Sequence, residues 1–265
     1  MRMKKLIFCI FIFFVLTSFS GDWHLVKQIP FTGITSFTTD NLGNVYVVNE
    51  NLLLQFDNNG KPLNHYDEKN LGQLGYVDAG NPLKVLAFYP DFAQINILNS
   101  QLALQSTIEL RGLGIEQPAL ICNSNVDYGI WVYDRQDFKL KKIDLNLQVT
   151  RESANIPQLI GKDINPQFLV EGGKYLLMAD PGMGILFFDQ YGTYFKTHPA
   201  KNVYYMQATE DELFYVSNGS FYSYNFKTLA EQKTDLPVAD SLSAARIGQH
   251  RLFLNINNEL KIFSD

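Results

Sequence analysis

The chain has 265 residues, of which 22 are basic and 27 acidic, and its formal net charge is −5. This acidic balance argues against a nucleic-acid partner, because phosphate binding requires a basic surface. Only one of the two cysteines, Cys122, lies beyond the first 20 residues, so no intramolecular disulfide is expected there and the thiol is expected to be buried and inert.

The first 20 residues have the pattern of a secretory signal peptide. Arg2, Lys4 and Lys5 precede an unbroken apolar run over residues 6–16, and small residues at positions 18 and 20 precede Gly21. The pattern predicts export to the periplasm or the cell exterior, with cleavage after about Ser20. Residues 21–265 then form a single domain with 19 basic and 27 acidic residues and a net charge of −8.

Two other interpretations of this segment fit less well. A transmembrane anchor needs ~20 apolar residues, and the run is well short of that. A lipoprotein signal at Cys9 is not favoured, because the bulky Phe8 precedes the cysteine and the apolar run continues after it.

The stretch over residues 40–60 has the pattern of two strands joined by short turns. Residues 45–48 are a β-branched and aromatic run, which is typical of a strand buried on both faces. A second run over residues 52–56 ends in a turn that includes Asn59 and Gly60, which can take the positive φ of a tight hairpin. The motif D-x-x-G-N-V-Y-V, followed by a hydrophobic run and F-D-x-x-G, resembles the NHL repeat, a blade unit of six-bladed propellers. The later repeats keep the strand and turn pattern but not these residues.

The strongest strand recurs at intervals of 40, 45, 45, 38 and 39 residues, which gives six units: 45–48, 85–89, 130–133, 175–178, 213–216 and 252–254. A period of about 40 residues indicates a propeller. The strand that follows each one ends in a polar residue, mostly Asp or Asn, whose side chain can bond its own backbone two residues on and start the next turn: Asp57, Asn99, Asp144, Asp189, Asn225 and Ser264.

These units predict an all-β fold, a six-bladed β-propeller of four-stranded blades. Innermost strands are expected over residues 75–79, 167–170 and 203–208, and shorter, more polar outer strands over residues 106–110 and 194–197. No segment has apolar residues at helical spacing over three turns. A β-sandwich or an open β-solenoid is the alternative, but regular four-strand units favour the propeller.

Residues 23–29 precede the first unit, and the chain ends directly after the third strand of the sixth. We therefore expect residues 23–29 to supply the outer strand of blade six, which closes the ring and removes an open edge. Burial of Trp23, Leu25, Val26 and Ile29 is expected to stabilise the fold by several kcal/mol, at ~1.5 to 3 per large apolar side chain.

In this architecture, the loops between second and third strands share one face with the connections between blades. Candidate binding residues fall in or beside these loops: Tyr89, Asp91, Phe92, Asp134, Asp137, Phe138, Asp180 and Met183. The tyrosine, the two phenylalanines and the methionine are expected to form an exposed apolar patch. In an alternative interpretation, Asp91, Asp134 and Asp180 converge on calcium, as in the calcium-dependent lactonases that share the six-bladed fold. Turn-forming aspartates that point into water are the simpler explanation.

No catalytic motif accompanies these residues. The histidines His24, His65, His198 and His250 are isolated in the sequence and fit solvated positions at strand edges and turns. We therefore expect an exported, non-catalytic binding or scaffold module of the bacterial cell envelope, without a cofactor, whose partner is another envelope or secreted protein or a glycan. Two alternatives stay open: a calcium-dependent lactonase-like hydrolase, and a carbohydrate binder that uses Tyr89, Phe92 and Phe138 as stacking platforms.

Overall fold

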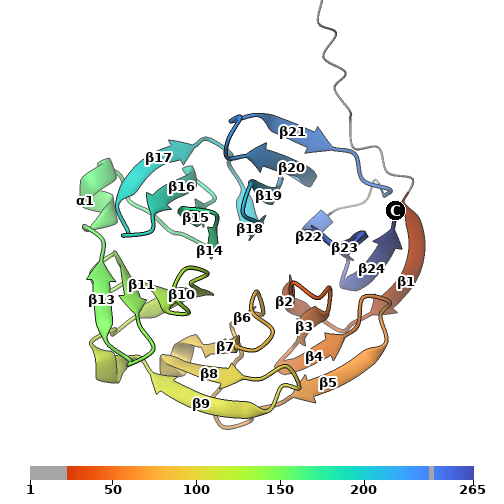
Figure 1. Cartoon of the computed structure of the whole chain (residues 1–265), viewed down its shortest axis with the longest axis horizontal. Helices are drawn as coiled ribbons and strands as arrows, with labels where there is room; N and C mark the ends of the chain where they lie inside the picture. Colours follow the sequence, from red (N-terminus) through yellow and green to blue (C-terminus); the bar gives the residue numbers. More distant parts are fainter. Residues whose placement is uncertain (1–22, 239–241) are drawn as a thin grey trace, which may run out of the picture.

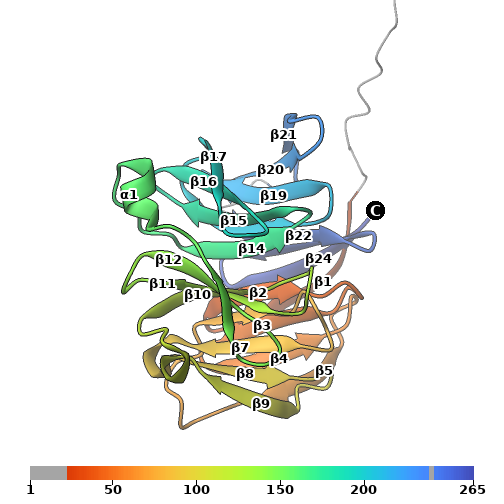
Figure 2. The ribbon, with the colours of Figure 1, turned by 60° about the vertical axis from the view of Figure 1, so that its left-hand side comes forward.

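Six four-stranded antiparallel sheets surround a central axis in the computed structural model, which describes residues 23–238 and 242–265 (Figure 1). In Figure 1 the innermost strand of each sheet lies near the axis and the outermost one lies at the rim, and Figure 2 shows the same ring turned by 60° about the vertical axis. The predicted six-bladed β-propeller is confirmed. The predicted signal peptide and its cleavage site lie outside the described residues.

Five blades are built from consecutive strands. Blade one contains β2 (Ile34–Thr39), β3 (Val45–Asn49), β4 (Leu52–Phe56) and β5 (Pro62–Tyr66). Blade two contains β6 (Tyr76–Asp78), β7 (Val85–Tyr89), β8 (Gln94–Leu98) and β9 (Leu104–Glu109). Blade three contains β10 (Pro118–Asn123), β11 (Ile130–Asp134), β12 (Lys139–Ile143) and β13 (Val149–Glu152). Blade four contains β14 (Phe168–Gly172), β15 (Tyr175–Asp180), β16 (Gly184–Asp189) and β17 (Tyr194–His198). Blade five contains β18 (Val203–Ala208), β19 (Glu212–Ser217), β20 (Ser220–Asn225) and β21 (Glu231–Thr234).

Blade six is shared between the two ends of the chain. Its first three strands are β22 (Leu242–Gly248), β23 (Arg251–Ile256) and β24 (Glu259–Ser264), and β1 (His24–Pro30) is its outer strand. The pairing of β1 with β24 is antiparallel, so that Pro30 lies opposite Glu259 and His24 opposite Ser264. The ring closes as predicted, because β1 covers the edge that β24 would otherwise leave open.

The turns between third and fourth strands follow the predicted rule. In five blades the side-chain oxygen at the end of the third strand accepts a hydrogen bond from the backbone amide two residues on: Asp57, Asn99, Asp144, Asp189 and Asn225. Each of these turns is therefore fixed by one short polar side chain.

The core lies between the blades. Every residue of β7 and of β11 is buried, which agrees with the β-branched and aromatic composition of these second strands. Cys122 is buried beside Trp131 and Tyr133, and burial raises the pKa of its thiol well above the ordinary value. The prediction of a buried, inert cysteine fits this environment.

Three short helical segments interrupt the loops of the described residues. They are η1 (Pro90–Phe92), η2 (Arg111–Leu113) and α1 (Ile156–Ile160). The α1 helix begins where the side chain of Asn155 accepts a hydrogen bond from the backbone amide of Gln158, and it ends at Gly161 in the left-handed region. It is too short to produce the three-turn apolar period that sequence analysis requires. No helix in the described residues is long and apolar enough to cross a membrane.

Candidate functional site

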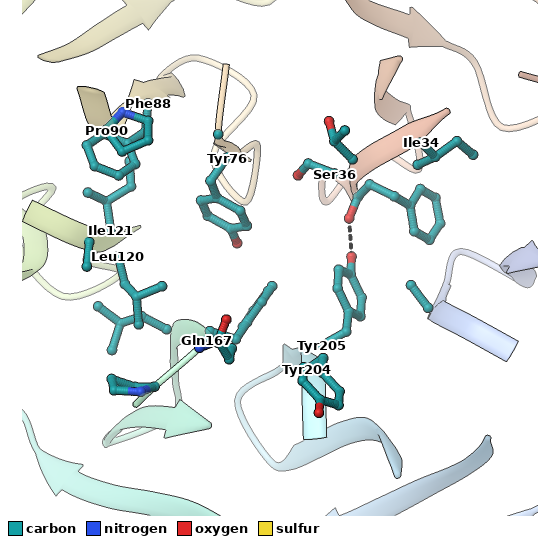
Figure 3. A pocket seen from close by; sticks show the side chains of 18 of the residues that line it. Ile34, Ser36, Tyr76, Phe88, Pro90, Leu120, Ile121, Gln167, Tyr204 and Tyr205 are labelled. Carbon is teal, nitrogen blue, oxygen red and sulfur yellow. Dashed lines mark hydrogen bonds between the residues drawn. The ribbon is translucent and has the colours of Figure 1, made fainter. Parts of the chain in front are cut away.

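A cavity of about 390 Å³ lies on the propeller axis, among the beginnings of the innermost strands (Figure 3). We call it the axial cup. Its lining also includes Pro90 and Arg135, which belong to loops between second and third strands. The cup therefore belongs to the face on which sequence analysis placed the binding site.

Irregular pairing at the mouth presents four side chains to the cup. In β2, β10, β18 and β22 the register with the neighbouring strand shifts within the first residues of the strand. Residues at these shifts line the cup: Thr35, Ala119, Tyr204 and Ser243. A β-bulge re-aims a side chain away from the regular alternation, and here it turns the strand beginnings into the rim of a cavity.

An aromatic layer crosses the axis at the cup. Phe168 lies with its ring centroid 5.0 Å from that of Tyr205 and 5.4 Å from that of Tyr76, and Phe37 stacks on Tyr205 at 6.1 Å. The hydroxyl of Tyr205 also donates to the backbone carbonyl of Phe37 (Figure 3). These rings come from blades one, two, four and five, so the layer ties opposite sides of the ring together.

Arg246, on β22, supports this layer. Its Nε donates to the hydroxyl of Tyr205 at 2.7 Å, and its guanidinium also donates to the side chain of Thr38. The guanidinium carbon lies 5.3 Å from the centroid of the Tyr205 ring. Arg246 is buried, and among the described residues no carboxylate lies within ion-pair distance of it. Its contacts are those of a residue that holds Tyr205 in place.

The polar groups of the cup are mostly uncharged, and they include the hydroxyls of Thr35, Ser36 and Ser243. Gln167 and Asn255 contribute carboxamides from blades four and six, and Arg135 is the one charged side chain among the described lining residues. Asn255 is buried, and its Oδ1 has no hydrogen-bond partner in the described part of the chain. Burial raises the pKa of Tyr76 and of Tyr205 above the ordinary value, so both hydroxyls are neutral at physiological pH.

Tyr204 is the most exposed aromatic side chain at the mouth. It is 60% exposed, and it lines the cup as well as two neighbouring grooves. One groove passes over the loop that contains Pro181 and Met183, and the other passes over Asn218 and Leu242. Sequence analysis placed Tyr204 in an innermost strand and did not select it. Its exposure depends on the register shift, for which the sequence carries no signal.

The predicted apolar residues of this face differ in exposure. Phe92 and Phe138 are 49% and 40% exposed, and Met183 is half-buried beside Tyr204 in its groove. The prediction that Tyr89 adds exposed surface is wrong. Its ring is buried with Tyr46 and Leu74 between blades one and two, because the last residue of a second strand still packs into the inter-blade core.

The predicted carboxylates have separate environments. Asp91 is exposed in η1. Asp134 is buried and accepts hydrogen bonds from the backbone amides of Gln117 and Gln136. Asp180 is also buried and accepts from three backbone amides, of which those of Gly182 and Met183 belong to its own loop. Both buried aspartates therefore hold the loops in shape.

The alternative prediction of a calcium site on Asp91, Asp134 and Asp180 is wrong in its geometry. Within residues 23–238 and 242–265, no three carboxylate, imidazole or thiol groups come close enough together to hold a metal ion. Lys141 instead contacts Asp134 and Asp137, at 2.8 and 3.0 Å. Burial opposes the charged form of Asp134, but the hydrogen bonds from Lys141 and the backbone amides keep the pKa of this carboxyl below its ordinary value.

The histidines lie away from the cup. His24 and His65 are exposed on outer strands, and His250 is exposed in the turn before β23. His198 departs from the predicted solvated position. It ends β17, and its Nε2 lies 2.9 Å from Glu231 and 3.2 Å from the hydroxyl of Tyr215, both on blade five. This contact joins two blades.

No family model and no curated protein sequence matches the chain. The resemblance to NHL repeats therefore remains a prediction from the first repeat. Solved structures do match. The WD40 domain of Pan2 from Neurospora crassa has a TM-score of 0.64 at 10% identity, over 91% of this chain and 95% of that one.

Two other solved structures are similar over most of their length. A catalytically inactive variant of virginiamycin B lyase from Staphylococcus aureus, with quinupristin, has a TM-score of 0.60 at 12% identity, over 92% of this chain and 100% of that one. BBS1N in complex with ARL6DN has a TM-score of 0.57 at 18% identity, over 87% of this chain and 77% of that one. At these identities the likeness establishes the propeller fold alone.

Proposed function

We propose that the protein is a non-catalytic binding module that holds its partner at the axial cup and the grooves beside Tyr204. The observation that carries this proposal is the composition of the cup. Its described lining contains aromatic and aliphatic side chains, the hydroxyls of Thr35, Ser36 and Ser243, two carboxamides and one arginine, and it contains no carboxylate, imidazole or thiol. Such a lining is typical of sites in which apolar walls supply affinity and a few polar groups fix orientation.

The same composition argues against acid–base or nucleophilic chemistry in the cup. A general base needs a pKa near the working pH, whereas burial moves the pKa values of Tyr76 and Tyr205 further above it. The hydrolase alternative depends on carboxylates that lie apart. Among the proteins of similar fold, BBS1N is described in complex with another protein, which supports a protein as the partner.

We further propose that the protein is exported and acts in the bacterial cell envelope or outside the cell. The support is the N-terminal pattern of basic residues, an apolar run and small residues before Gly21. The intact mass of the exported protein is expected to equal that of a chain that begins at Gly21 and carries no lipid. A diacylated mass, or a mass that retains Met1, would contradict this part of the proposal.

Site-specific photocrosslinking in cells tests the binding proposal. p-Benzoylphenylalanine replaces Tyr204 in one strain and Tyr128 in another. Tyr128 is 64% exposed in the turn between β10 and β11, at the opposite end of these strands from the cup. A discrete adduct is expected from position 204 and not from position 128. Equal labelling from both positions, or no adduct from position 204, would overturn the proposal.

A further inference from the structure

We infer that the ligand of the axial cup is an extended peptide segment of a partner protein, which inserts one large apolar side chain into the cup and places an acidic side chain beside Arg135. This inference rests on the proposed function and names the ligand class of the same site. Four features of the cup and its surroundings carry it.

The walls of the cup are the first feature. Phe88, Leu120, Ile121 and Phe168 contribute apolar surface from blades two, three and four (Figure 3). The volume of about 390 Å³ lies within the range of small-molecule sites and accommodates an aromatic or long aliphatic side chain. Although Thr35, Ser36 and Ser243 offer hydroxyl partners in the cup, a sugar would leave some of its hydroxyl groups against these apolar walls, which is costly. An apolar anchor of a polypeptide fits them better.

The carboxamide of Asn255 is the second feature. It is 7% exposed, it lines the cup, and its Oδ1 has no hydrogen-bond partner among the described residues. A buried polar atom without a partner destabilises the fold, so no contact of the described chain explains an amide at this position. A carboxamide carries one acceptor and two donors, which are the groups needed to pair with a peptide bond.

The grooves beside the cup are the third feature. Because Tyr204 lines the cup and both grooves, the three depressions meet at one side chain. They extend over blades four, five and six, from Asp163 and Pro181 to Asn218 and Leu242. An extended chain anchored in the cup would continue into these grooves on either side of Tyr204. A compact small molecule would use the cup alone.

The charge at the rim is the fourth feature. Arg135 is exposed in the loop between β11 and β12, and within the described residues its guanidinium makes no ion pair or hydrogen bond. An unpaired arginine at the edge of an apolar cavity favours a carboxylate on the ligand. The peptide residues that lie nearest to Arg135 are therefore expected to include Asp or Glu.

Selection from a library of short random peptides displayed on phage tests this inference with the purified protein. The wild type is expected to enrich sequences that combine a large apolar residue with Asp or Glu a few positions away. Arg135→Glu is expected to keep the apolar residue and to exchange the acidic residue for Lys or Arg. Lys61→Glu, an exposed charge reversal in the turn between β4 and β5, is the matched control and is expected to select as the wild type does.

Two variants test the cup itself. Ser243→Trp fills the mouth at an exposed position and is expected to abolish enrichment while the protein stays folded. Asn255→Leu is expected to weaken the binding of a selected peptide about tenfold, the effect of one lost hydrogen bond in a buried site, and to raise the melting temperature. A structural role of Asn255 would instead lower the melting temperature.

The outcomes separate this inference from the proposed function. A folded wild type that enriches no common sequence, or enriches sequences without an apolar residue, overturns the peptide ligand. If position 204 nevertheless forms adducts in cells, and glycosidase removes the added mass from the protein, the binding module stands and its ligand is a glycan. If neither adducts nor enriched peptides form, both proposals fail.

Discussion

Asp134 and Asp137 contact the same lysine from very different environments. Their carboxylates lie 2.8 and 3.0 Å from the ammonium of Lys141, but the side chain of Asp134 is 1% exposed and that of Asp137 is 35% exposed. Removing one partner of a buried ion pair leaves an uncompensated charge, whereas an exposed pair contributes little. Sequence analysis gave both residues the same role, whereas their different burial gives them different contributions to stability.

Asp134→Asn is expected to lower the free energy of unfolding by about 1–3 kcal/mol, because it weakens the hydrogen bonds from Lys141, Gln117 and Gln136 while Lys141 keeps its contact with Asp137. Asp137→Asn is the matched control and is expected to cost less than about 1 kcal/mol. Urea denaturation measures both. Equal losses in the two variants would contradict a structural role specific to Asp134.

His198 gives the fold a pH dependence whose direction can be worked out. Burial of the imidazole, with the nearby Lys196, lowers the pKa of His198 below its ordinary value of 6.5, although Glu231 acts in the opposite direction. The folded state therefore binds the proton more weakly than the unfolded state. The contribution of His198 to stability is present above about pH 6.5 and is lost as the pH falls through the folded-state pKa.

We expect the unfolding free energy of the wild type to decrease as the pH falls from about 7.5 to 5.5. The decrease is expected to be smaller in His198→Gln. His65→Gln is the control, because it makes the same side-chain exchange at an exposed position of β5. Urea denaturation at both pH values measures the difference. A His198→Gln variant with the full pH dependence of the wild type would assign the effect to another group.

At the level of elements, β1 closes the ring for a reason that differs from the expected one. Sequence analysis attributed its stabilisation to buried Trp23, Leu25, Val26 and Ile29. Leu25 and Val26 are 54% and 39% exposed, and only Trp23 and Ile29 pack partly against the core. The strand stabilises blade six mainly through its backbone pairing with β24, in which each hydrogen bond contributes about 0.5–1.5 kcal/mol.

Deletion of residues 23–29 is expected to lower the melting temperature and to promote aggregation, because it exposes the edge of β24. Thermal unfolding with light scattering measures both effects. The double substitution Leu25→Ser and Val26→Ser keeps the backbone pairing and is expected to change the melting temperature little. If it destabilises the protein as much as the deletion, side-chain burial is the main contribution after all.

The blades could be predicted from sequence because their signals are local. A run such as residues 45–48 and a turn residue such as Asp57 act within a few positions, so their structure follows from their own chemistry. The shift at Tyr204 depends on how β18 pairs with β19. Strand register depends on long-range packing as well as on the residues of the strand itself, so the rim of the cup could not be predicted from the chain alone.

On the scale of the whole molecule, the cavity lies on the face that sequence analysis selected, but it lies at the axis and not at the loop tips. Loops between second and third strands do border the cavity, as Arg135 and Pro90 do. The cup itself is formed where innermost strands of six blades meet on the axis (Figure 1). Residues as distant as Ser36 and Asn255 share its lining, and no spacing along the chain reveals that both line one cavity.

The last prediction decides which part of this face binds the partner. p-Benzoylphenylalanine at Met183, which lines a groove with Tyr204, serves as a fixed crosslinking probe. Adduct formation in cells is expected to disappear when Tyr204→Ala is added, because this change removes the side chain common to the cup and both grooves. Loss of a 60% exposed ring is expected to leave the melting temperature nearly unchanged.

The matched comparison is Phe92→Ala with Phe138→Ala, which removes the two exposed rings of blades two and three. Because neither residue lines the cup or the grooves beside Tyr204, we expect the adduct at Met183 to persist. Thermal unfolding of each variant confirms that it is folded. If the adduct instead survives Tyr204→Ala and disappears in the double variant, the partner binds over blades two and three, and the axial cup is not its site.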